Sequence, residues 1–145
     1  MDKETLGQYL SLKKEIKKLE RDISRLKEKM VPIVSGKVRG SSREFPYIEQ
    51  SFKVEMEDPV EADRLRKLEM VKRRRLELAQ SQRLAIEEFV AGIDRSDIRM
   101  IFEMIFIEGK KQNEVAKILN MDRSSISKKI NRYLQLSHNS HFPVL

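Results

Sequence analysis

The chain has 145 residues, of which 37% are charged and only 6% aromatic, a composition that favours extended helices over one large core. Its 30 basic and 23 acidic residues leave a net charge of +7, which suits a polyanionic partner such as double-stranded DNA. Cysteine is absent, which excludes disulfides and thiolate metal sites, and no apolar run approaches the roughly 18 residues of a membrane span, so we expect a cytoplasmic protein without a membrane partner.

Residues 9–30 carry apolar side chains at alternating steps of three and four, the heptad pattern of a helix that buries one face against another helix. The positions are Tyr9, Leu12, Ile16, Leu19, Ile23, Leu26 and Met30. Isoleucine at one core position and leucine at the other favours a two-stranded coiled coil, and hence a homodimer, if the partner is a second copy. The same face can instead pair with the second long helix of its own chain, and both readings stay open. Leu12, Ile16, Leu19, Ile23 and Leu26 are therefore the candidates for oligomerisation or helix pairing.

Between residues 31 and 57 the apolar period changes to two, which predicts a small β-hairpin. Phe52, Val54 and Met56 alternate with charged residues, and glycines and serines earlier in the segment supply turn positions. Pro46 has no N–H to donate to a central ladder, so its strand lies at an edge or begins after it. A flexible linker would not need the apolar side chains found here, such as Tyr47.

A long helix is predicted from Pro59, because Asp58 is a good N-cap, proline suits the first helical position and Glu61 can reach back in a capping box. Gly92 ends it. One face is apolar, formed by Leu65, Leu68, Leu76, Ala79, Ile86 and Val90. The basic cluster at residues 72–75 is either a second contact with the DNA backbone or, as charged helix faces more often are, solvated.

A third helix is expected to begin between Asp94 and Asp97 and to stop at Gly109, which suits the left-handed conformation that follows a helix end. Its apolar spacing predicts one buried face. The residues expected in that face are Ile98, Ile101, Phe102, Ile105 and Phe106.

Residues 109–134 have the spacing of two short helices that cross at a tight turn, the helix-turn-helix signature of DNA-binding proteins. The first helix is expected from about Gln112 to Ile118, and Asn120 in the turn adopts the left-handed conformation more cheaply than most residues do. Asp122 is expected to cap the second helix. The residues expected to be buried are Val115, Ala116, Leu119, Met121, Ile126, Ile130 and Leu134.

The outer face of the second helix would then carry side chains suited to DNA, since arginine or lysine binds guanine, asparagine pairs with adenine and serine serves a base or a phosphate. The candidate base-facing residues are Arg123, Ser124, Ser125, Ser127, Lys128 and Asn131. The candidate phosphate contacts are Lys110, Lys111, Gln112, Lys129 and Arg132. The competing interpretation is a solvated helix face, but seven basic against two acidic residues in this segment add sequence-independent affinity for phosphate.

The segment EEFVAGIDRSDIRMIFEMIFIEGKKQNEVAKILNMDRSSISKKINRYL resembles sigma-70 region 4 as it occurs in small phage-encoded transcriptional regulators of the ArpU and RinA groups. The resemblance is best over residues 86–136, and the middle segment GSSREFPYIEQSFKVE is also similar to such regulators. It implies that the second helix reads a promoter, through the matching positions Arg123, Ser124, Ser125, Ser127 and Lys128. Two residues depart from the family pattern: Lys111 stands where serine or threonine commonly caps the first helix, and Asn120 stands where glycine is usual.

We therefore expect a mainly α fold with three parts. Residues 1–80 form long, coiled-coil-like helices with the hairpin at about 31–57, residues 81–137 form the sigma-70 region 4-like DNA-binding domain, and residues 138–145 form a tail. The expected function is sequence-specific transcriptional regulation of phage genes, with RNA polymerase as a second partner implied by the resemblance. A phage small terminase-like DNA-packaging subunit and a protein-interaction adaptor are the alternatives.

Enzyme chemistry finds no support in the sequence, which has no glycine-rich phosphate loop, nucleophile motif or compact cluster of histidine and carboxylates. His138 and His141 have the spacing of two metal ligands, but no third ligand is near them in the sequence. We therefore expect no catalysis, no cofactor and no bound metal.

Overall fold

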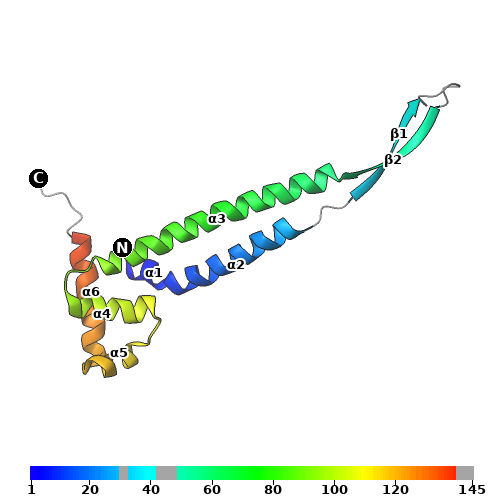
Figure 1. The fold of residues 1–145 in the computed structure, drawn as a ribbon. Helices are drawn as coiled ribbons and strands as arrows, with labels where there is room; N and C mark the ends of the chain where they lie inside the picture. Colours follow the sequence, from blue (N-terminus) through cyan, green and yellow to red (C-terminus); the bar gives the residue numbers. More distant parts are fainter. Residues whose placement is uncertain (30–32, 42–48, 140–145) are drawn as a thin grey trace, which may run out of the picture. The chain divides into compact units, whose positions relative to one another are not determined.

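The computed structural model describes residues 1–29, 33–41 and 49–139, and most of these are helical (Figure 1). The elements in chain order are α1 (Lys3–Gly7), α2 (Tyr9–Glu28), β1 (Ile33–Ser41), β2 (Glu49–Glu57), α3 (Pro59–Ala91), α4 (Ser96–Phe102), the π-helical turn η1 (Glu103–Ile107), α5 (Gln112–Leu119) and α6 (Arg123–Asn139). The predicted mainly α class is confirmed. Within the described ranges, no helix is both long and apolar enough to cross a membrane.

The chain forms two compact units, and their boundary differs from the predicted one at residues 80 and 81. The first unit contains Met1–Leu19 together with the chain from Leu76, and the second unit is Glu20–Arg75. The first nineteen residues belong with the C-terminal part because Leu6 and Leu12 are buried in the same apolar cluster as Ile101 and Ile126.

The second unit contains the later part of α2, the two strands and the first part of α3. Strands β1 and β2 pair antiparallel, with Ile33 opposite Glu57 and Ser41 opposite Glu49. They lie in the segment for which the sequence predicts a hairpin. The turn of that hairpin would fall at residues 42–48, which include Pro46 and Tyr47 and lie outside the described residues.

Helix α3 begins as the sequence predicts, but one of its expected contacts is absent. The Asp58 carboxylate accepts a hydrogen bond from the Val60 N–H at 3.0 Å, and Pro59 is the first helical residue. The capping box predicted for Glu61 is wrong, because Glu61 binds the Arg64 guanidinium through two hydrogen bonds of 2.6 and 3.0 Å. Two charge-assisted bonds to a neighbouring guanidinium outweigh the single bond that a backbone N–H offers.

The heptad face of α2 is buried by the chain itself. Leu12 and Ile16 are each 4% exposed and lie in the core of the first unit, with α3 residues such as Ile86. Leu19 and Ile23 are also buried, Leu26 is half-buried, and Met30 lies outside the described residues. This arrangement favours intramolecular helix pairing over a coiled-coil dimer, because a dimer would need the same face.

The segment after α4 departs from the single regular helix that was predicted. The Glu108 N–H donates to the Glu103 carbonyl at 2.9 Å, a bond that closes the wider π-helical turn η1. The extra residue per turn shifts the apolar spacing, so Ile105 is half-buried where full burial was expected. Gly109 has a φ of 77°, as predicted for the residue that ends this segment.

Candidate nucleic-acid interface

Helices α5 and α6 are joined by a turn at residues 120–122, one residue later than predicted at its start. Asn120 has φ 51° and ψ 49°, which confirms the predicted left-handed conformation. The Met121 N–H donates to the Ala116 carbonyl at 2.9 Å and closes the end of α5. The Asp122 carbonyl accepts the first helical bond of α6, from the Ile126 N–H at 3.2 Å, so Asp122 occupies the N-cap position.

One face of α6 is fixed in the core of the first unit. Ile126 and Ile130 are fully buried and Leu134 is 7% exposed, as the spacing predicted. The ring of Tyr133 meets that of Phe102 edge to face at a centroid distance of 5.4 Å. Because these contacts set the rotation of α6 about its axis, the side chains on its other face point away from the core.

Ser124, Lys128 and Asn131 of the six predicted base-facing residues are exposed on this outer face, and Arg123 is exposed at the first position of α6. Ser125 and Ser127 are half-buried at its two flanks. A shallow hollow runs along the helix, and its lining residues are Lys128, Lys129, Asn131, Arg132 and Gln135. Sequence reasoning missed Gln135, although its place four residues after Asn131 was a sufficient signal.

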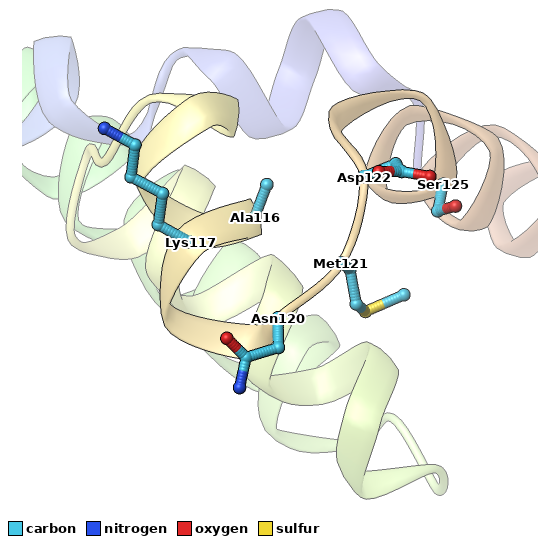
Figure 2. Close-up of a pocket in the computed structure, with 6 residues that line it drawn as sticks. All are labelled: Ala116, Lys117, Asn120, Met121, Asp122 and Ser125. Carbon is cyan, nitrogen blue, oxygen red and sulfur yellow. The ribbon is translucent and has the colours of Figure 1, made fainter.

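A second hollow lies where α5, the turn and α6 meet, and Figure 2 shows the six residues that line it. They are Ala116, Lys117, Asn120, Met121, Asp122 and Ser125. In Figure 2 Asp122 and Ser125 lie next to each other at the start of α6, whereas Lys117 extends from α5 away from them. The Ser125 hydroxyl, the Asn120 carboxamide and the Lys117 ammonium group around this hollow can donate hydrogen bonds to an anionic partner. The sequence analysis did not single out Lys117 or Asn120 for that role.

The five predicted phosphate contacts differ in their present partners. Lys111 and Arg132 are exposed, and Gln112 is half-buried at the start of α5. Lys110 forms an ion pair with Glu108, with Nζ and Oε2 3.1 Å apart. Lys129 forms an ion pair with Asp97 of α4, with Nζ and Oδ2 3.2 Å apart.

The Asp97 carboxylate binds a second cationic side chain besides Lys129. It accepts two hydrogen bonds from the Arg95 guanidinium, at 3.2 Å from Nε and 2.9 Å from Nη2. The hydrogen bond from Lys129 holds the pKa of the Asp97 carboxyl below its ordinary value, and the nearby charge of Arg95 acts in the same direction. Asp97 is therefore ionised at neutral pH and binds both cations.

Among the residues that the structure describes, no group of three or more histidine, cysteine, aspartate or glutamate side chains is placed to hold a metal ion. His138 lies in the last turn of α6, and His141 is outside the described ranges. Helix α6 extends to Asn139, so the predicted tail begins later than residue 138.

Comparison with known protein families, with curated proteins and with solved structures finds no match to this chain.

Proposed function

We propose that this protein is a sequence-specific DNA-binding transcriptional regulator in which α5 and α6 act as a helix-turn-helix. Helix α6 is the recognition helix and enters the major groove, which is wide enough to admit an α-helix. Gln112, the first residue of α5, and the preceding Lys110 and Lys111 contact the phosphate backbone. The protein then works by recruiting or excluding other proteins at a promoter, without chemistry of its own.

The exposed row on α6 carries this proposal. Ser124, Lys128, Asn131 and Gln135 follow one another at steps of four, three and four, so they lie on one face of the helix. All four are exposed, while Ile126 and Ile130 on the other face are fully buried. A rigid helix that presents an ammonium group, a hydroxyl and two carboxamides together suits base edges better than it suits simple solvation.

The resemblance to sigma-70 region 4 supports a promoter element of the −35 type as the target and RNA polymerase as a second partner, in the regulation of phage genes. A small terminase-like packaging subunit and a protein adaptor are the competing functions. The experiment described next separates them from a regulator.

The test is selection of bound sequences from a random duplex pool at a stated, near-physiological salt concentration. We expect one enriched sequence, and each lost base contact should cost about 1–3 kcal/mol of discrimination. The variant Arg123→Ala with Lys128→Ala should lose binding to the selected duplex by about tenfold or more and keep its helix content.

The matched control is Lys17→Ala with Arg21→Ala, which removes the same two charges from exposed positions of α2. This control should keep sequence preference. An asymmetric site would support the region 4 mode, and two inverted half-sites would support a dimer on DNA. A pool without enrichment, or equal losses in the two double variants, would overturn the proposal.

A further inference from the structure

Arg95, Asp97 and Lys129 form a small cluster, defined here as the Asp97 cluster, that joins the start of α4 to the middle of α6. One carboxylate oxygen, Oδ2, accepts from Arg95 Nη2 at 2.9 Å and from Lys129 Nζ at 3.2 Å. The two cationic groups therefore lie within hydrogen-bond reach of a single oxygen. Arg95 comes from outside the two helices that carry the proposed interface, so no sequence pattern connects it with Lys129.

From this geometry we propose that the Asp97 cluster is a binding site for a DNA phosphate, occupied in the free protein by the Asp97 carboxylate. A phosphodiester and a carboxylate each present one negative charge and two acceptor oxygens, so the same donors serve both. On binding, the phosphate takes over the donors and the Asp97 side chain turns away. The inference rests on the proposed function and adds a specific residue, Asp97, that lowers the affinity for DNA.

Exposure of the cluster allows this exchange. The side chains of Arg95, Asp97 and Lys129 are 70%, 41% and 34% exposed, so a polymer backbone can reach them. Ion pairs with this much exposure contribute little net stability, so exchanging one anion for another does not require a large rearrangement. The triad as a whole carries one net positive charge, which attracts an anion from solution.

The cluster is also continuous with the proposed interface. Lys129 lines the hollow along α6 together with Lys128 and Arg132, so one side chain belongs to both features. A duplex that places base edges against Lys128 and Asn131 must carry its backbone along the flanks of α6. Lys129 marks one flank, and the Asp97 cluster lies there.

The experiment measures affinity for the selected duplex and for an unrelated duplex over a range of salt concentrations, with full-length protein. Asp97→Asn keeps the shape of the side chain and removes its charge. We expect it to bind both duplexes about threefold tighter or more at low salt, with a steeper dependence on salt by up to about 0.9 in the logarithmic slope. Arg95→Ala should do the reverse.

Asp94→Asn is the matched control, because Asp94 is an exposed acid three residues away that makes none of the contacts of the cluster. It should change affinity less than Asp97→Asn does and leave the slope unchanged. The double variant Asp97→Asn with Lys129→Ala should lose the gain. Thermal unfolding of each variant shows whether it is folded at the assay temperature.

The outcomes separate the two proposals. If the wild type selects a sequence but Asp97→Asn binds like Asp94→Asn, or more weakly than the wild type, the phosphate site is overturned and the regulator proposal stands. A gain that survives removal of Lys129 also overturns the phosphate site. If the wild type binds no duplex, the regulator proposal fails and the phosphate site fails with it.

Discussion

Leu10 Cδ1 lies 2.6 Å from the position that a Cβ atom on Gly109 would occupy. Gly109 also has a φ of 77°, in the left-handed region that side chains disfavour. The residue that connects η1 to α5 is therefore held as glycine for two reasons, backbone conformation and close approach to α2. Both residues belong to the first unit.

Gly109→Ala should lower the free energy of unfolding by about 1–2 kcal/mol, mainly through strain at the backbone, because the clashing atom is the end of the exposed Leu10 side chain, which can move aside. Chemical denaturation measures the loss. Gly7→Ala is the control, because a Cβ at Gly7 would meet no atom within 4 Å, and alanine in a helix should be neutral or stabilising there. Adding Leu10→Ala to Gly109→Ala should recover only the part due to the clash. Equal stability of the two glycine variants would contradict this account.

Ile16→Ala should destabilise the monomer itself. Ile16 is 4% exposed in the core of the first unit, and truncation of such a side chain costs about 2–5 kcal/mol. Val71→Ala on an exposed part of α3, where the valine is 62% exposed, should stay within about 0.5 kcal/mol of the wild type. The unfolding midpoint of the wild type should not change with protein concentration. A midpoint that rises with concentration would indicate that the heptad face pairs between chains.

Lys111→Ser should make α5 more stable and DNA binding weaker. Lys111 occupies the N-cap position in an extended conformation without a side-chain capping bond, and a serine hydroxyl there should add about 1 kcal/mol. Loss of the charge should reduce the salt slope of DNA binding by about 0.9. Lys111→Ala is the control, because it should weaken DNA binding equally without the gain in stability. Identical unfolding curves for the two variants would rule out the cap.

Glu87→Gln should change how stability depends on pH. The hydrogen bonds from the Tyr9 hydroxyl at 2.6 Å and from Arg83 at 3.0 Å hold the pKa of Glu87 below its ordinary 4.5. A lowered carboxyl pKa gives stability that is present above pH 4.5 and is lost as the pH falls through the folded value. The variant should therefore be less stable at pH 7, by less than about 1 kcal/mol because the site is partly exposed, and the difference should narrow in acid.

At alkaline pH the contact between Tyr9 and Glu87 makes stability depend on pH in the opposite direction. Burial, and then the hydrogen bond to Glu87, raise the pKa of Tyr9 above its ordinary 10.0. Stability from Tyr9 is therefore present below pH 10 and is lost as the pH rises through the folded value. Denaturation at several pH values measures both effects. Glu88→Gln, at an exposed neighbouring position, is the control and should give a curve parallel to that of the wild type.

Local patterns predicted the local features well. The three- and four-residue spacing of Ile126, Ile130 and Leu134 was enough to give the buried face of α6, because helix periodicity alone decides which side chains share a face. The left-handed Asn120 followed from its place between two periodic segments. The N-cap role of Asp58 and the place of Pro59 as the first residue of α3 also followed from neighbouring residues alone.

Features that depend on distant residues could not be predicted in this way. Lys129 and Asp97 are 32 residues apart, and no spacing rule connects them. The π-helical turn η1 breaks the helical period on which the prediction relied. The unit boundary was misplaced because the sequence could not show that Leu6 and Leu12 fill the core around Ile126.

The core of the first unit is built from two segments that lie on either side of the second unit in the sequence, and this sets the order of events during synthesis. Leu6, Leu12 and Ile16 leave the ribosome before the second unit, and their partners in α4 and α6 follow only after the whole second unit has been made. The apolar face of residues 1–19 cannot be buried against α4 and α6 until those helices have been made. The second unit forms a long loop between these partners, and closing a long loop slows folding. A fragment starting at residue 81 would lack those early side chains, so α5 and α6 expressed alone would have an incomplete core.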